Sequence, residues 1–260
     1  KLTNAQERTI KEISDDISLT KPMRRLVQGD VGSGKTVVAA VSMYISAKNN
    51  TQSVLLCPTE VLAEQHFKNF SAWFKNSNIK IELLTGKMPV SKRREIYQDL
   101  EDGVIDILIG THAVFQDKVK MKNLGLVVVD EQQRFGVKQR FDLVKKSSDQ
   151  IMPHQLFMTA TPIPRTLAMT IFADLETSKI DELPPGRKPV ETLVYSDKKK
   201  DEIVKRLETV CKSGNQVFWL CTMIEESENL DVQAADEAKE WIKENTNGLN
   251  IGLVHSKLSK

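Results

Sequence analysis

The chain has 260 residues, of which 40% are hydrophobic and 28% charged, so it can bury a substantial core and is not a disordered tail. Its 37 Lys and Arg nearly balance its 35 Asp and Glu, and the net charge of +2 excludes DNA attraction through a strongly basic overall field. The three cysteines form no CxxC pair and no apolar run is long enough to span a membrane, which excludes a disulfide scaffold, a zinc ribbon and a membrane protein. We therefore expect a cytoplasmic protein.

Short β-branched runs alternate with longer segments of helical period over most of the chain, which is typical of a parallel sheet with crossover helices. The predicted strands are 26–28, 54–57, 79–84, 105–109, 124–129 and 155–158. The predicted helices are 35–47, 60–74, 91–100 and 164–172. Aromatic residues recur at helical spacing in 67–74 and predict core packing, and His66 and His154 are expected to be structural. This pattern favours an α/β fold.

Residues 183–189, with the sequence LPPGRKP, interrupt the pattern, because three prolines and a glycine continue neither a helix nor a central strand. We place a linker at 183–193, between a first domain at 1–182 and the opening of a second at 194–260. After residue 189 we predict strands at 190–195, 216–221 and 251–254, with helices at 198–212 and 232–244. Because the chain starts without a methionine and stops just after an apolar run, we expect a fragment of a longer protein, cut inside the second domain.

The segment 29–36, with the sequence GDVGSGKT, matches the phosphate-loop pattern between a predicted strand and a predicted helix. Glycines let successive backbone N–H groups point at a phosphate, and the helix N-terminus adds its positive dipole end. Lys35 would reach the β- and γ-phosphates, and the Thr36 hydroxyl would ligate Mg²⁺. The predicted nucleotide-binding residues of this loop are Gly29, Asp30, Val31, Gly32, Ser33, Gly34, Lys35 and Thr36.

Two adjacent carboxylates, Asp130 and Glu131, follow the most apolar predicted strand. The carboxyl end of such a strand is where α/β sheets place their ligand crevice. Asp130 would hold Mg²⁺ and Glu131 would orient and polarise the attacking water. Together with the loop that carries Lys35, the pair predicts an NTP hydrolase that uses Mg²⁺ rather than a mere nucleotide binder.

The segment 159–162, with the sequence TATP, follows the predicted strand 155–158 at the same sheet edge. Combined with the acidic pair, it resembles the superfamily 2 helicases and translocases and disfavours a phosphoryl-transfer kinase. Longer segments resemble the bacterial RecG family in the right order along nearly the whole chain. They are LTNAQ (2–6), GDVGSGKTVVAA (29–40), PTEVLAEQH (58–66), GTHAVFQ (110–116), DEQQRFGVKQR (130–140), MTATPIPRTLAM (158–169), LPPGRKPVET (183–192) and IEESENLDVQAA (224–235).

This resemblance implies a RecA-like motor domain, the opening of a second one, and an ATP-dependent DNA helicase that remodels double-stranded or branched DNA such as forks and Holliday junctions. It implies that Gln6 reads adenine and that Thr159 and Thr161 couple the γ-phosphate to the grip on DNA. The residues implied to contact the DNA backbone are Thr59, Gln65, Thr85, Gly86 and Thr111. We expect a monomer associated with the bacterial nucleoid.

Two departures from the family pattern are visible. Gln133 stands where the family usually has histidine, so it can hydrogen-bond in the coupling role but cannot titrate. The family's later motifs, including an arginine finger, and its N-terminal wedge domain are absent from the sequence, so we expect nucleotide binding without full activity. Two alternatives remain: a transcription-repair coupling translocase, which shares several of these motifs, and a nucleotide-binding module without hydrolysis.

Overall fold

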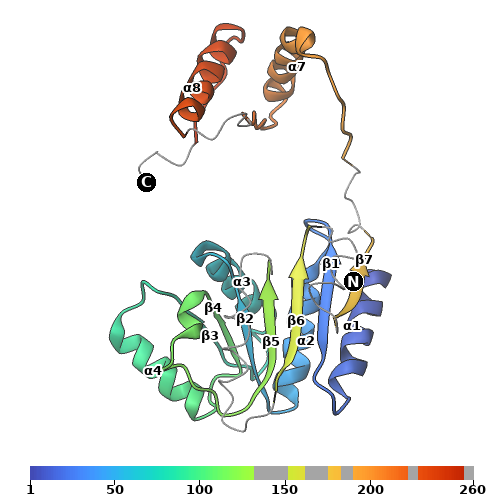
Figure 1. The fold of residues 1–260 in the computed structure, drawn as a ribbon, viewed down its shortest axis with the longest axis vertical. Coiled ribbons are helices and arrows are strands. Elements are labelled where there is room, and N and C mark those ends of the chain that lie inside the picture. Colours follow the sequence, from blue (N-terminus) through green and yellow to red (C-terminus); the bar gives the residue numbers. More distant parts are fainter. Residues whose placement is uncertain (132–151, 162–174, 183–189, 222–227, 255–260) are drawn as a thin grey trace. The chain divides into compact units, whose positions relative to one another are not determined.

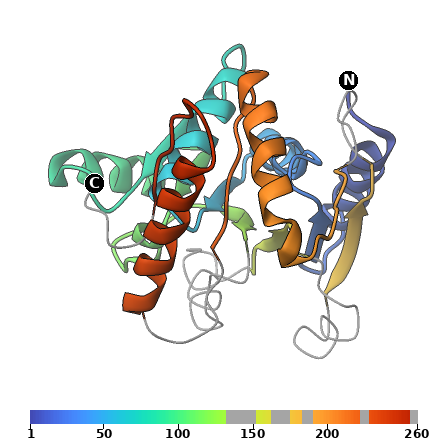
Figure 2. The same cartoon turned by 90° about the horizontal axis from the view of Figure 1, so that it is seen from above.

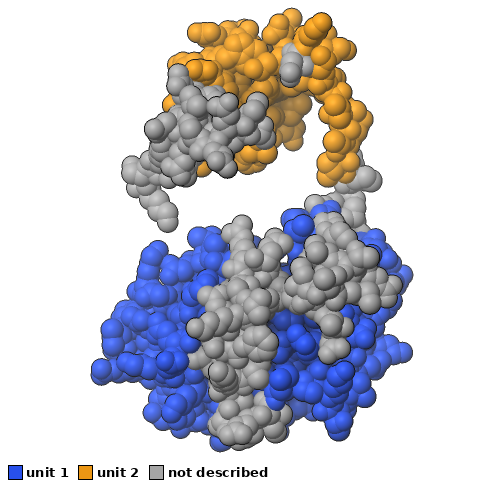
Figure 3. All heavy atoms as spheres, viewed as in Figure 1, with its two compact units in different colours: residues 1–187 blue, residues 188–260 orange. Residues whose placement is uncertain are grey.

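The computed structural model describes residues 1–131, 152–161, 175–182, 190–221 and 228–254. The chain divides into two compact units, Lys1–Arg187 and Lys188–Lys260 (Figure 3). That division falls within the segment 183–193, and the limits of the two expected domains stay a prediction. The predicted helix at 164–172 lies outside the described residues.

In the first unit, seven strands of the described residues form one sheet in the order β3-β4-β2-β5-β6-β1-β7 (Figure 1). Every neighbouring pair is parallel. The strands are β1 (Arg24–Gly29), β2 (Gln52–Leu56), β3 (Ile81–Leu84), β4 (Ile107–Gly110), β5 (Leu124–Asp130), β6 (His154–Thr159) and β7 (Glu176–Ile180). The predicted α/β fold with a parallel sheet is confirmed.

Helices cover both faces of this sheet, and the side chains of strands β1 to β6 alternate between two apolar clusters, one on each face. Leu126 and Val128 of β5 face the cluster that contains α1 (Asn4–Ile17), α2 (Lys35–Lys48) and α3 (Glu60–Trp73). Val127 and Val129 face the opposite cluster. That second cluster contains α4 (Val90–Glu101) and the 3₁₀ helix η1 (His112–Phe115), and Figure 1 and Figure 2 show these helices in two views.

Besides the short 3₁₀ helix η1, one helix and one strand described in this unit were not among the predicted elements. Helix α1 begins with a capping box, in which the Thr3 hydroxyl accepts from the Gln6 N–H and the Gln6 side chain accepts from the Thr3 N–H. This signal was present in the sequence, since Thr at the cap and Gln three residues later form such a box. Strand β7 is an edge strand, and its sequence ETSKI buries only Ser178 and Ile180. Its apolar pattern is too short to indicate a strand.

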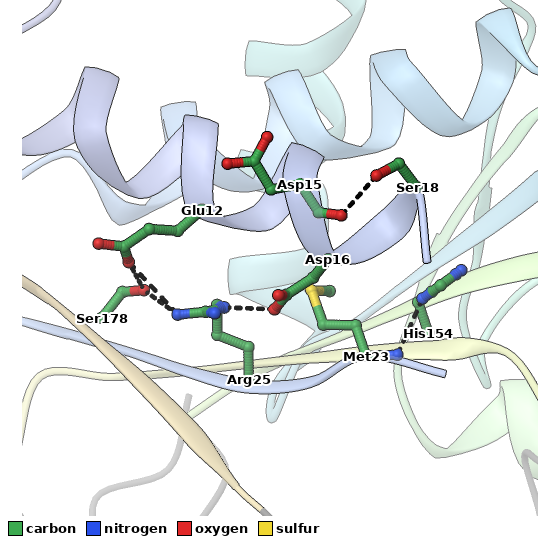
Figure 4. Close-up of polar contacts among 8 residues, drawn as sticks. All are labelled: Glu12, Asp15, Asp16, Ser18, Met23, Arg25, His154 and Ser178. Atoms are coloured by element: carbon green, nitrogen blue, oxygen red, sulfur yellow. Dashed lines mark hydrogen bonds and ion pairs between the residues drawn. The ribbon is translucent and has the colours of Figure 1, made fainter. Parts of the chain in front are cut away.

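A buried arginine fastens α1 to the sheet (Figure 4). The Arg25 guanidinium on β1 donates through Nε to Asp16 Oδ2 at 2.8 Å, and through Nη1 to Ser178 Oγ at 2.8 Å and Glu12 Oε2 at 3.3 Å. Ser178 Oγ donates in turn to Glu12. Arg25 is 8% exposed, so its charge is stabilised by these partners from α1 and β7 rather than by water.

The second unit contains a short 3₁₀ turn η3 (Asp197–Lys199), helix α7 (Lys200–Lys212) and helix α8 (Glu228–Glu244). The two predicted helices there are close to the observed ones. The predicted strands at 190–195, 216–221 and 251–254 are wrong, because none of these residues forms a strand in the structure. Apolar runs identify extended chain, but a strand also needs a paired neighbour, and side chains such as Val194 and Phe218 lie exposed instead.

No helix among the described residues is long and apolar enough to cross a membrane.

Candidate functional site

The parallel strands bring the candidate residues to one edge of the sheet, because the carboxyl ends of parallel strands all lie on the same side. The sheet order sorts these residues into two groups. Neighbouring strands β3, β4 and β2 are followed by residues expected to contact DNA: Thr85 and Gly86, Thr111, and Thr59. Neighbouring strands β5, β6 and β1 end in or are followed by residues of the expected nucleotide site: Asp130 and Glu131, Thr159 and Thr161, and the loop 29–36.

The loop between β1 and α2 is tight at both of its ends. A Cβ at Gly29 would lie 2.6 Å from Ser33 Oγ, and a Cβ at Gly34 would lie 2.2 Å from Gln6 Nε2. Gly34 also has a φ of 91°, a left-handed conformation that favours glycine. The Ser33 N–H donates to the Asp30 carbonyl at 3.1 Å, which closes the turn. The close contacts and the backbone conformation explain why glycines occupy these two positions.

Lys35, the first residue of α2, turns its ammonium group back onto this loop. Its Nζ donates to the Gly29 carbonyl at 2.6 Å and to the Asp30 carbonyl at 3.0 Å. Burial lowers the pKa of Lys35, and the negative charges of Glu131, Asp130 and Asp30 partly oppose that shift. The lysine and the acidic pair, almost a hundred residues apart in the sequence, therefore share one electrostatic environment.

Gln6 on α1 contacts the same loop. Its Nε2 donates to the Ser33 carbonyl at 2.9 Å, while its Oε1 accepts from the Thr3 N–H at 3.0 Å. Gln6 is 6% exposed. Helix α1 therefore contacts the phosphate loop through Gln6. The family resemblance implies that this same residue reads adenine.

Asp130 and Glu131 end β5 with different geometries. Strand alternation places Asp130 on the face of Leu126 and Val128, which α3 covers, and Asp130 Oδ2 lies 2.9 Å from His66 Nε2. Glu131 has a φ of 53°, a left-handed conformation that is unfavourable for a residue with a Cβ. Such strained residues cluster at functional sites, which supports a chemical role for this carboxylate.

His66 is a site residue that the sequence analysis assigned to packing alone. A signal for it was present, because His66 shares the helical stripe of Ala63 and Phe70, which are both buried. A polar ring on a buried stripe needs a hydrogen-bonding partner, and here that partner is the candidate metal ligand Asp130.

Thr159 and Thr161 lie beside this site after β6. Thr159 is fully buried, and its hydroxyl accepts from the Thr161 N–H at 3.1 Å. The Gln28 side chain on β1 donates to the Thr161 carbonyl at 3.3 Å, so the turn is joined to the strand that leads into the phosphate loop. Gln133, the third expected coupling residue, lies outside the described residues.

The residues expected to contact DNA differ in accessibility. Thr59, Gln65 and Gly86 are exposed, whereas Thr85 and Thr111 are each 8% exposed. The Thr59 hydroxyl accepts from the Leu62 N–H at 3.3 Å and caps α3.

The loop after β3 also contacts the start of α3. Lys87, next to Gly86, pairs with Glu60, the first residue of α3 and next to Thr59, at 3.0 Å. The ion pair therefore brings Gly86 and Thr59 into the same neighbourhood.

The residues of this edge fit a magnesium nucleotide. Mg²⁺ prefers oxygen ligands and is held by one or two carboxylates plus phosphate oxygens, which suits Thr36 and Asp130. Ser33 Oγ is buried without a hydrogen-bonding partner among the described residues, in a loop whose backbone is shaped by Gly29 and Gly34. No group of three or more His, Cys, Asp or Glu suited to a metal ion occurs in the described part of the chain. The oxygen donors present, Thr36 and Asp130, therefore suit a cation that is shared with phosphates.

Comparisons with known proteins agree with this geometry. A family model described as "DEAD/DEAH box helicase" matches residues 3–170. The ATP-dependent DNA helicase RecG of Haemophilus influenzae is 49% identical over 258 residues, which is 98% of this chain and 37% of that protein. The RecG of Escherichia coli (strain K12) is 49% identical over 260 residues, 99% of this chain and 38% of that protein. The chain thus spans less than two fifths of the length of these relatives.

A solved structure of RecG bound to a three-way DNA junction is similar with a TM-score of 0.80 and 38% identity, covering 94% of this chain and 31% of that one. The resemblance to RecG is confirmed over nearly the whole chain. Because the family model spans more than half of its residues, the chain belongs to the DEAD/DEAH box helicases.

Proposed function

We propose that this chain is the ATP-binding part of a DNA motor that couples ATP hydrolysis to translocation on double-stranded DNA and remodels branched DNA. The observation that carries the proposal is the meeting of the phosphate loop, Lys35 and the pair Asp130–Glu131 at one sheet edge. It is supported by the similarity to relatives named ATP-dependent DNA helicase RecG. A structure of one such protein is described as bound to a three-way DNA junction.

In this proposal the loop 29–36 holds the phosphates of ATP through its backbone N–H groups, and Lys35 exchanges its two loop carbonyls for phosphate oxygens. Thr36 and Asp130 hold Mg²⁺. The bound ion would neutralise charge on the phosphate oxygens. Gln6 recognises adenine from α1, beside the loop that it already contacts.

Glu131 orients and polarises the attacking water from its left-handed position after β5. Thr159 and Thr161, with Gln133, couple the presence of the γ-phosphate to the affinity for DNA. The residues that contact the DNA backbone are Thr59, Gln65, Thr85, Gly86 and Thr111. Hydroxyls, amides and N–H groups suit a motor, because they contact phosphates and sugars without reading bases.

The partner would be double-stranded or branched DNA, such as a fork or Holliday junction, and the protein would act as a monomer in the bacterial cytoplasm, at the nucleoid. Because the chain spans about 37–38% of two relatives, we expect it to bind nucleotide while showing little DNA stimulation and no fork unwinding. The segments 1–182 and 194–260 would be one motor domain and the opening of a second, joined by the linker 183–193.

Calorimetric titration with a slowly hydrolysed ATP analogue and MgCl₂ tests the nucleotide site. Lys35→Ala removes charge-assisted hydrogen bonds, so its affinity should fall about 10- to 100-fold. Lys48→Ala, in the last turn of the same helix α2, is the matched control and should bind like the parent. Equal affinity for Lys35→Ala and the parent would reject the phosphate-loop assignment.

Single-turnover hydrolysis distinguishes the motor from a nucleotide-binding module without hydrolysis. Glu131→Gln should keep ATP binding and lose most hydrolysis, because Asp130 still holds the metal. Near-parental hydrolysis by this variant would mean that Glu131 is not the base.

Fluorescence anisotropy with a three-way junction and a linear duplex tests the DNA site. With a net charge of +2, binding by this chain should be weak and fall steeply with salt. Thr59→Ala and Gln65→Ala should weaken it, whereas Lys122→Ala, on the loop that leads into β5, should not. Equal affinity of all four proteins for DNA would contradict the assignment of these residues.

A further inference from the structure

The imidazole of His66 is placed with little freedom. His66 is 7% exposed, its ring meets Phe70 edge-on with centroids 6.3 Å apart, and Phe70 is itself fully buried. Its Nε2 lies 2.9 Å from Asp130 Oδ2, and its Nδ1 has no partner among the described residues. With the carboxylate as acceptor, Nε2 carries the hydrogen in this contact. Among the described residues, the ring therefore makes one hydrogen bond, which it donates to Asp130.

This contact spans the boundary between the two groups of residues along the sheet edge. Helix α3 follows β2, the last strand of the DNA group, whereas Asp130 ends β5, the first strand of the nucleotide group, and β2 and β5 are paired neighbours. Gln65, which precedes His66, is exposed to solvent. Adjacent residues of one helix thus face two environments, because Gln65 is exposed to solvent and His66 is buried against the candidate metal ligand Asp130.

We propose that His66 is a positioning residue that fixes the Asp130 carboxylate for the metal. The contact engages one carboxylate oxygen, Oδ2, and so leaves Oδ1 for Mg²⁺ or its coordinated water. Without the Nε2–H donor, the carboxylate can rotate about its side-chain torsions, and a rotated carboxylate no longer presents an oxygen at a constant place. Outer-shell hydrogen bonds of this kind orient the ligands of metal sites. The inference rests on the proposed function, in which Asp130 is a metal ligand.

The test is the magnesium dependence of nucleotide affinity, which measures binding rather than turnover. The affinity of the whole chain for a slowly hydrolysed ATP analogue is measured by calorimetry in MgCl₂ and in EDTA. Loss of an outer-shell partner typically costs about 10- to 100-fold in metal affinity. His66→Leu, which fills similar space without a donor, should therefore lose about tenfold or more of the gain in affinity that Mg²⁺ gives the parent, and should match the parent in EDTA.

Two further variants separate the hydrogen bond from general packing. His66→Gln places an amide N–H where Nε2 lies and should retain the magnesium gain, whereas His154→Asn, at the opposite edge of the sheet, should behave like the parent. If His66→Leu does not fold, His66→Asn replaces it, because its shorter amide does not reach Asp130 and should lose the same gain.

The magnesium gain of each protein decides between the possible roles of His66. A full magnesium gain in His66→Leu or His66→Asn would overturn the assignment of His66 alone. An equal loss in His66→Gln would overturn it too, because the donor would then not be what matters. Absence of a magnesium gain in the parent would instead overturn the proposed role of Asp130 as a metal ligand, and this inference with it.

Discussion

The Gln6 side-chain amide and the Ser33 main-chain carbonyl are joined by a hydrogen bond of 2.9 Å, which ties the start of α1 to the turn of the phosphate loop. The bond closes over Gly34, where a Cβ would lie 2.2 Å from Gln6 Nε2. The left-handed backbone therefore favours glycine at this position, and a Cβ here would also displace the Gln6 amide from its hydrogen bond to Ser33.

Gly34→Ala should destabilise the chain and abolish nucleotide binding, because the new methyl group displaces Gln6 as well as straining the backbone. The matched control is Gly214→Ala, since Gly214 has a similar φ of 86° but no atom within 4 Å of the place that a Cβ would occupy. Urea unfolding should show a loss of about 1 kcal/mol for the control and clearly more for Gly34→Ala. Equal losses of unfolding free energy in the two variants would show that the contact with Gln6 does not contribute to stability.

Glu131→Gly should stabilise the fold while removing hydrolysis. A residue with a Cβ at a φ of 53° carries strain of about 1–3 kcal/mol, part of which glycine relieves at the expense of a more flexible unfolded chain. We expect a net gain of about 1 kcal/mol in the free energy of unfolding. Asn50→Gly, at a φ of 55°, is the control and should gain less, because asparagine tolerates this conformation. A loss of stability in Glu131→Gly would show that the side chain, rather than strain, dominates at this position.

Arg25→Met should destabilise the first unit, because it leaves the carboxylates of Glu12 and Asp16 without their cation. Breaking a buried pair costs about 3–5 kcal/mol, and we expect about 2–3 kcal/mol here since both carboxylates keep some solvent contact. Arg8→Met removes the exposed pair with Asp181 and should cost much less than Arg25→Met in the same urea titration, because solvent screens an exposed pair. If the two variants unfolded at the same urea concentration, the cluster in Figure 4 would contribute no more than a surface pair.

His154 should make stability depend on pH. Burial lowers the pKa of His154 below its ordinary 6.5, with the charge of Asp16 partly opposing the shift, and His154 Nδ1 accepts the Met23 N–H at 2.9 Å only when it is not protonated. The unfolded chain therefore binds the proton at a higher pH than the folded chain. The contribution of His154 is complete above pH 6.5 and is lost as the pH falls through the lowered folded pKa.

His154→Asn tests this, because its Oδ1 can accept the same hydrogen bond and does not titrate. Between pH 7 and pH 5 the parent should lose unfolding free energy relative to His154→Asn, measured by urea unfolding at each pH. A difference between the two proteins that stays constant over this interval would argue against the buried, neutral imidazole.

Local patterns in the sequence were sufficient to locate most of the strands and helices of the first unit. The run LGLVVV has no polar alternation, which indicated a strand covered on both faces, and β5 has apolar clusters on both sides. The loop 29–36 was found because its glycines, lysine and threonine must be neighbours in the chain to surround a phosphate. Its strand–loop–helix setting is the one that the structure contains.

Hydrogen-bonded pairing between strands decided which runs of residues form strands, and the sequence alone did not predict it. The runs at 190–195 and 216–221 have the composition of strands but form none in the described structure, because a strand is completed by hydrogen bonds to a neighbour and not by its own residues. The edge strand β7 shows the converse: ETSKI has a weak pattern of its own and is a strand because β1 pairs with it.

The order of the strands was likewise a property of the tertiary structure alone. The sequence placed Asp130, Thr59 and the phosphate loop each after a strand, but only the order β3-β4-β2-β5-β6-β1-β7 separates the residues expected to contact DNA from those expected to hold nucleotide. The same order puts β2 beside β5 and so brings His66 onto Asp130 across 64 residues of sequence. The sequence predicted a structural role for His66, but its partner depends on which strand lies beneath α3, and long-range packing decides that.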